Sequence, residues 1–219
     1  MYSEEEAKLL SMFCKTRALI KDEQNQENAM CSAVLEGAEC YCKAILLLLD
    51  KNYVYPAKAL MRCLCELTIK LMWCLQCPDD TNEIQDSQIV DEKAHRWEKK
   101  TLAQNINVLK EFKNVNLENN KIDDLIKKLE MKKDKIKVKE MPKYADLLKG
   151  LPMEFRRKIS VKLYSDFHKA IHLDSNSLVK LYLHGNKTNI NNGELNELKD
   201  FCFALANLVT GIIATNYKE

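Results

Sequence analysis

The chain has 219 residues, and its 34 Lys and Arg nearly balance its 32 Asp and Glu, which leaves a formal net charge of +2. This balance excludes the global basic field on which non-specific nucleic-acid binding usually depends, so any basic contact surface must be local. Only five Gly and four Pro occur, between long stretches rich in Leu, Lys, Glu, Ala and Met. The composition predicts an all-α fold, a helical bundle of about six to seven helices.

The length fits one large helical domain better than two small ones. We expect an N-terminal helix within residues 1–27 and a helical bundle over residues 28–219, together forming one continuous domain over residues 1–219.

Nine cysteines occur, mostly inside apolar helical stretches and without a leading signal peptide. An odd number in this setting is not typical of a secreted disulfide framework, so we expect a reducing, cytoplasmic location. Residues 44–49 are too few to cross a bilayer, and the longer apolar segment 57–77 contains four charged residues. We therefore expect no membrane span and no membrane partner.

Ser3 and the three glutamates after it predict a helix start, because a hydroxyl caps the first turn and acidic side chains complement the helix dipole. This helix should run to about Lys21. Residues 28–49 place apolar side chains at mixed spacings of three and four, which predicts a helix with a broad buried face. Asp50, Lys51 and Asn52 should end it.

Tyr55-Pro56 should open a third helix over residues 57–77, since proline is tolerated in a first turn. Apolar residues surround most of this segment, so we expect it to be the central helix. A polar loop over residues 81–88 should precede a fourth helix, residues 90–112. The inner side of that helix is marked by four residues, Trp97, Leu102, Ile106 and Leu109.

Residues 121–143 hold nine lysines and five acidic residues. We interpret this stretch as a solvated helix face in preference to a nucleic-acid patch, because no aromatic residue is interleaved before Tyr144. Met141-Pro142 should begin a short helix through Leu148. Two further helices, residues 154–173 and 192–217, complete the bundle.

Arg62 and Glu66 lie four residues apart in the central helix and so share one face. One interpretation is a solvent-facing stripe in which the pair stabilises the helix slightly. The other is a helix buried on all sides, where the two charges form a polar site. Periodicity alone favours the first.

Tyr164, His168 and His172 lie one turn apart in the segment 154–173. A phenol and two imidazoles can supply a general acid or base near neutral pH, or two ligands of a metal site. Zinc needs further ligands that no neighbouring motif supplies, so we expect no metal and no cofactor. Two ordinary surface histidines remain an equally good interpretation.

Cys74 and Cys77 form a C-x2-C at a helix end, whereas a thioredoxin-like motif follows a strand. The pairs Cys40/Cys42 and Cys63/Cys65 should point to different helix faces. We interpret the cysteines as buried apolar thiols.

The segment 59–66 (ALMRCLCE), a helix with Trp97, the run Pro142-Lys143-Tyr144 and the pattern Tyr164-Ser165-x6-His172 resemble a bacterial helical domain family of unknown function. The family is similar to the HEPN group and to abortive-infection proteins. The resemblance covers roughly residues 28–183. It places the family's arginine and glutamate on Arg62 and Glu66, its tyrosine on Tyr164 and its histidine on His172, with His168 as an accessory residue.

The resemblance implies a bundle that is often dimeric, with polar residues of two helices facing a cleft, and a role in RNA or nucleotide binding or metal-independent RNA cleavage. In such a ribonuclease, Arg62 would stabilise a phosphate while His172 serves as acid or base in attack by the 2′-hydroxyl, oriented by Tyr164 and Glu66. The chain lacks the R-x4–6-H of the ribonuclease members. The alternative is a non-catalytic interaction module whose polar residues form a structural network.

Overall fold

A computed structural model of the chain describes residues 4–20, 26–75, 87–115, 120–149, 159 and 192–217. All secondary structure in these ranges is helical, which confirms the predicted all-α fold. The chain divides into two compact units, Met1–Ile84 with Ala145–Glu219 and Gln85–Tyr144. The expected domain boundaries themselves stay a prediction.

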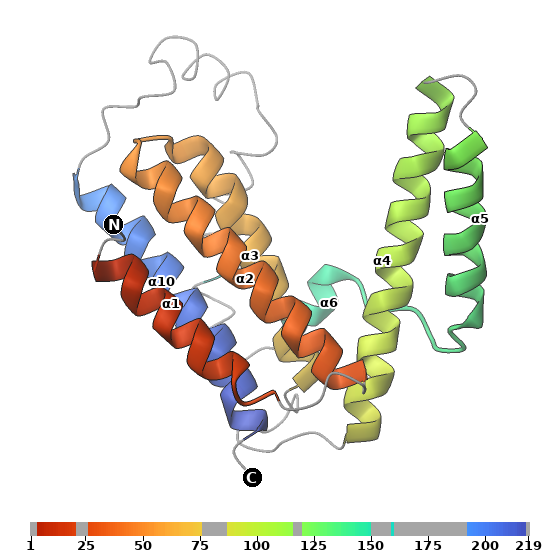
Figure 1. Ribbon diagram of the computed structural model, residues 1–219, viewed down its shortest axis with the longest axis horizontal. Helices are drawn as coiled ribbons and strands as arrows, with labels where there is room; N and C mark the ends of the chain where they lie inside the picture. Colours follow the sequence, from red (N-terminus) through yellow and green to blue (C-terminus); the bar gives the residue numbers. More distant parts are fainter. Residues whose placement is uncertain are drawn as a thin grey trace. The chain divides into compact units, whose positions relative to one another are not determined.

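Four helices of the first unit pack together as a bundle (Figure 1). They are α1, Glu4–Arg17, α2, Gln26–Asp50, α3, Val54–Leu75, and α10, Asn192–Asn216. α2 lies against α3, α10 contacts both, and α1 packs on α2 and α10. A short helix, α6, Tyr144–Lys149, begins where the second unit ends and buries Leu147 and Leu148.

The turn between α2 and α3 has the predicted composition and a defined geometry. Asn52 adopts a left-handed conformation with φ of 61°. The amide of Tyr53 donates to the carbonyl of Leu48 at 2.8 Å, and that of Asn52 donates to Leu49 at 2.9 Å. This pair of bonds is a Schellman motif, which satisfies the last carbonyls of a helix and favours Gly or Asn at the left-handed position. The structure thus confirms that α2 ends at Asp50 to Asn52.

α3 is the central helix of this unit, as expected. Every residue of α3 from 57 to 75 is buried or half-buried, and the fully buried set includes Met61, Leu64, Ile69 and Leu71. Buried Thr68 donates to the carbonyl of Leu64 at 2.8 Å, so its hydroxyl is satisfied within the helix.

α10 is long and apolar enough to cross a bilayer by length and composition, with a mean hydropathy of 1.4 over an 18-residue window. This differs from the expectation from the sequence that no segment is apolar enough to span a membrane. Of that window, 44% is buried in the structure, and the helix packs on α1, α2 and α3. Burial and packing of this kind are typical of the core helix of a bundle, and such a helix can be as long and as apolar as a membrane span.

The second unit is a hairpin of α4, Ser87–Val115, and α5, Asn120–Lys135. α4 begins three residues before the expected position. Ile106 packs with Ile122 and Ile126 in the small core between the helices, flanked by Leu109 and Leu129. Residues 136–143 follow α5 without helical structure, so the lysine-rich stretch is not one continuous helix.

Candidate functional site

Arg62 and Glu66 form an ion pair within α3, as their spacing predicts. The Nε of Arg62 donates to Oε1 of Glu66 at 2.9 Å. The side chains are 23% and 33% exposed, so the pair is neither a solvent stripe nor a closed core site. The exposure of the pair thus lies between the two interpretations, and its role as a site stays a prediction.

A thiol and a phenol lie beside the pair. Burial raises the pKa of Cys63, the charge of Glu66 adds to this shift, and Arg62 opposes it. The pKa of Tyr41 on α2 is likewise raised by burial, with further contributions from Cys63 and Glu66. The groups around Arg62 are thus the carboxylate of Glu66, the thiol of Cys63 and, from α2, the phenol of Tyr41.

Lys58, one turn before Arg62, links α3 to α10 through an ion pair. Its Nζ lies 2.8 Å from Oε1 of Glu194 at the start of α10. A comparable pair joins Lys199 to Asp50 at 2.7 Å. These bridges position α10 against α2 and α3 and give Lys58 a structural role.

Tyr164, His168 and His172 lie outside the described residues. Their predicted meeting with Arg62 and Glu66 therefore stays a prediction. Among the residues that are described, no group of three or more His, Cys, Asp or Glu side chains is arranged to hold a metal ion.

The two cysteines of each i, i+2 pair differ in exposure, as their spacing predicts. Cys40 is exposed and Cys42 is buried, while Cys63 is half-buried and Cys65 is buried. Cys74 is also buried, and its C-x2-C partner lies outside the described ranges. Within the described ranges all cysteines are free thiols. Cys42 on α2 makes a side-chain hydrogen bond with Cys202 on α10.

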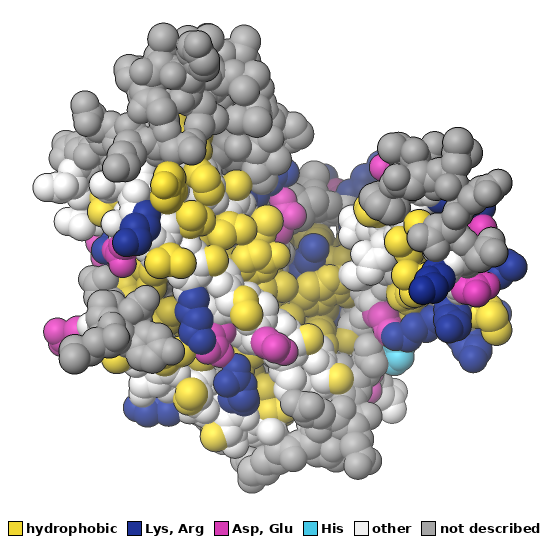
Figure 2. All heavy atoms as spheres, turned by 45° about the horizontal axis from the view of Figure 1, so that its top comes forward, with side chains coloured by type: hydrophobic (Ala, Val, Ile, Leu, Met, Phe, Trp, Pro, Cys, Tyr) yellow, Lys and Arg dark blue, Asp and Glu magenta, His cyan; other side chains and the backbone are white. Residues whose placement is uncertain are grey.

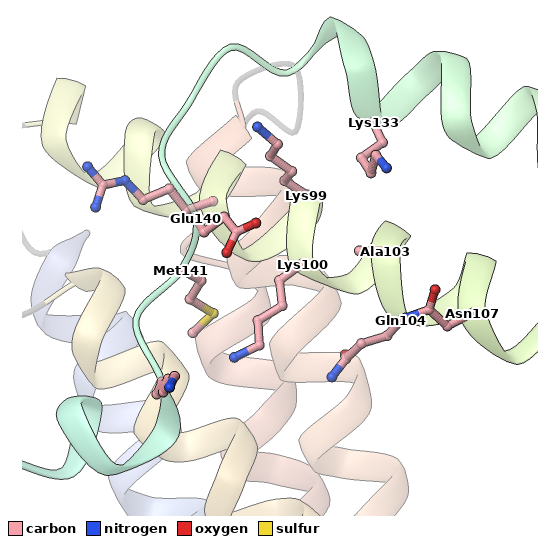
Figure 3. A pocket seen from close by; sticks show the side chains of 10 residues that line it. Lys99, Lys100, Ala103, Gln104, Asn107, Lys133, Glu140 and Met141 are labelled. Atoms are coloured by element: carbon pink, nitrogen blue, oxygen red, sulfur yellow. The ribbon is translucent and has the colours of Figure 1, made fainter.

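The second unit contains a basic pocket of about 470 Å³. Its lining comes from α4, from the end of α5 and from residues 136–143 (Figure 3). Five of the ten lining residues are cationic and one is acidic. The cationic residues are Arg96, Lys99, Lys100, Lys133 and Lys143.

The charges of this pocket, which we name the α4 pocket, are only partly compensated. Lys100 and Lys143 make no ion pair with another described residue. Lys99 donates from Nζ to the neutral carbonyl of Val138 at 2.9 Å, so its charge also remains. In Figure 3 the carboxylate of Glu140 lies between Lys99 and Lys100, which leave α4 in opposite directions. An anion entering here would meet several positive charges.

A second pocket of about 470 Å³ lies in the same unit, and we name it the α5 pocket. It is lined by His95 and Glu98 of α4, by Lys132 and Lys135 of α5, and by residues 136–138. Lys132 pairs with Glu98 at 2.7 Å. Figure 2 shows lysine and arginine side chains gathered over this unit.

The contribution of α4 to these pockets is not among the sequence-based predictions. Arg96 and Lys100 lie four residues apart and so share one helix face, whereas Lys99 lies three residues before Leu102 on the neighbouring side. That spacing was the available signal. The lysines of α5 were interpreted as a solvated face, and most are indeed exposed, but Lys133 is half-buried in the α4 pocket.

Comparisons with known proteins give one result. A family model described as a family of unknown function (DUF5677) matches residues 40–191, more than half of the chain. No curated protein and no solved structure matches. The match confirms the expected helical family of unknown function, while the HEPN-like and abortive-infection-like labels stay predictions.

Proposed function

The chain belongs to this family of unknown function, and we propose that it binds the phosphate groups of a nucleotide or RNA in the α4 pocket. The observation that carries the proposal is the gathering of five cationic side chains around one cavity, of which Arg96 is already ion-paired with Glu92. Phosphates are the common biological anions that match such an arrangement.

The size of the cavity supports this ligand class. Small-molecule and cofactor sites usually measure about 300–1,000 Å³, and the α4 pocket measures about 470 Å³. Gln104 and Asn107 at its edge add amide groups that hydrogen-bond to sugar or phosphate oxygens.

The lining also indicates which part of the ligand is recognised. None of its ten residues is aromatic, so the pocket offers no stacking surface for a base. Recognition through phosphate contacts tolerates different bases and weakens strongly with salt.

The binding test compares a pocket variant with a charge-matched control. Lys100→Gln with Lys143→Gln removes two charges that no described ion pair uses. Lys127→Gln with Lys128→Gln removes two exposed charges of α5 outside both pockets. Fluorescence anisotropy with labelled RNA and a labelled nucleoside triphosphate should show at least a tenfold loss for the first variant only. Equal affinities of both variants and the wild type would rule the proposal out.

RNA cleavage is a separate and finer proposal, in which Arg62 of the first unit holds a phosphate and His172 transfers a proton. The half-buried position of Arg62 beside Glu66 supports access of an anion to this arginine. Mixed RNA incubated with wild-type protein or His172→Ala, with and without chelator, tests it. Indistinguishable RNA profiles from the two proteins would count against cleavage.

A non-catalytic interaction module is the second candidate. The intrahelical bond from Arg62 to Glu66 and the bridge from Lys58 to Glu194 favour it, because both side-chain contacts are already made within the bundle. This candidate expects Arg62→Ala and His172→Ala to lower stability with no effect on any RNA.

A further inference from the structure

The two pockets of the second unit adjoin one another along three elements. On α4, His95 and Glu98 line the α5 pocket, whereas Arg96 and Lys99 line the α4 pocket. Residues next to each other in sequence thus face different pockets.

The same alternation occurs on the other two elements. At the end of α5, Lys132 and Lys135 line the α5 pocket and Lys133 lines the α4 pocket. After α5, residues 136–138 line the α5 pocket, and residues 140, 141 and 143 line the α4 pocket. Residues 136–143 therefore contribute to both pockets, and we name this segment the saddle.

One hydrogen bond holds the saddle to α4. Lys99 reaches the carbonyl of Val138 from the α4 pocket, and Val138 itself lines the α5 pocket. This bond therefore joins a lining residue of one pocket to a lining residue of the other.

The α5 pocket also carries uncompensated positive charge. Lys135 and Lys137 are exposed and make no ion pair with another described residue. The Nδ1 of His95 donates to the carbonyl of Asp91 at 2.8 Å, and its Nε2 has no partner among the described residues. This pocket can therefore accept an anion as well.

We infer that the α5 pocket is a second phosphate subsite, and that the ligand is an RNA whose backbone crosses the saddle with phosphates in both pockets. The inference rests on the proposed function and narrows its ligand class. A mononucleotide fills one pocket, whereas a strand gains from the cations of both. No Phe, Tyr or Trp lines either pocket, which predicts contacts mainly to phosphates with little base preference.

The test varies ligand length and pocket separately. The ligands are one labelled nucleoside triphosphate and labelled RNA oligonucleotides of increasing length. The variants are Lys135→Gln with Lys137→Gln for the α5 pocket, Lys100→Gln with Lys143→Gln for the α4 pocket, and Lys127→Gln with Lys128→Gln as the control. All six lysines are exposed or half-buried, and circular dichroism verifies that each variant is folded.

For the wild type we expect affinity to rise with length until both pockets are occupied. The α5-pocket variant should bind the triphosphate normally and the longer RNA at least tenfold more weakly. Its salt dependence should also flatten, since each lost phosphate contact lowers the slope of log K against log salt by about 0.7. The control should match the wild type.

Two outcomes distinguish failure of the second subsite in the α5 pocket from failure of phosphate binding in the α4 pocket. If the α5-pocket variant binds long RNA normally while the α4-pocket variant does not, the second subsite is wrong and the phosphate-binding function stands. If the α4-pocket variant also binds normally, both fail. Inorganic polyphosphate that displaces RNA better than unlabelled RNA of equal charge would overturn the choice of a nucleic acid.

Discussion

Lys99 and Val138 are joined by a hydrogen bond of 2.9 Å from the ammonium group to the backbone carbonyl. The donor belongs to α4, and the acceptor lies in the non-helical residues that follow α5. This single bond links two parts of the second unit that are 39 residues apart in sequence.

Replacing Lys99 should loosen the saddle. Lys99→Met keeps the apolar stem and removes the bond to Val138, which should cost about 1 kcal/mol of unfolding free energy, a usual value for one hydrogen bond. Limited proteolysis should then cut residues 136–143 faster than in the wild type. Lys128→Met, at an exposed position of the same unit, serves as control, and equal cleavage rates in both variants would contradict the expectation.

The ion pair of Arg62 and Glu66 should contribute modestly to stability. Because both side chains are partly exposed, we expect a coupling of about 0.3–1 kcal/mol, the range of surface and helix pairs. A double-mutant cycle with Arg62→Ala and Glu66→Ala, followed by urea unfolding, measures it. A coupling of several kcal/mol would show that the pair is buried and structural, which favours the interaction module.

The small core of the second unit should be sensitive to truncation. Ile126→Ala removes a 7% exposed side chain that packs with Ile106 and Ile122, and it should cost about 2–4 kcal/mol. Phosphate binding should fall with it, since α4 and α5 together form both pockets. Val108→Ala is the matched control, because Val108 is 63% exposed. Comparable losses in the two variants would argue against the assigned core.

Stability should decline at alkaline pH. Burial raises the pKa of the Cys31 thiol to about 12, whereas an unfolded cysteine titrates near about 8.5. The native state keeps the thiol proton at a pH where the unfolded state loses it. The contribution of Cys31 to the free energy of unfolding is therefore fully present below the unfolded pKa, and it is lost as the pH rises towards 12. The pKa values of Cys42 and Cys65 are raised as well. The hydrogen bond with Cys202 is the main cause for Cys42, followed by burial, and burial is the main cause for Cys65.

Urea unfolding between pH 8 and pH 11 under reducing conditions measures this effect, which reaches about 1.4 kcal/mol per pH unit for each such thiol. Cys31→Ala should reduce the slope by that amount, and the exposed Cys14→Ala should leave it unchanged. A slope that Cys31→Ala does not alter would refute the assignment.

Thiol accessibility gives an independent measurement on the native protein. Cys14 and Cys40 are exposed, while Cys42 and Cys202 are buried between α2 and α10. Brief alkylation followed by peptide mass spectrometry should modify the first two before the others. Simultaneous modification of all four would mean that the bundle opens readily.

The sequence by itself determined the order and approximate positions of the helices that the structure describes. Asn52 and Pro56 fixed the turn between α2 and α3 through local backbone preferences, and the apolar circumference of residues 57–77 identified the central helix. The pairing of Arg62 with Glu66 also followed from helical periodicity, because an interval of four residues places two side chains together.

Only the tertiary structure decided how exposed that pair is and where the basic pockets lie. Half-burial of Arg62 depends on the elements that cover α3, and periodicity carries no information about them. The α4 pocket requires Lys100 of α4 and Lys133 of α5 to line the same cavity, together with the saddle that is bonded to Lys99. Such contacts depend on long-range packing between separate helices, which local sequence patterns do not encode.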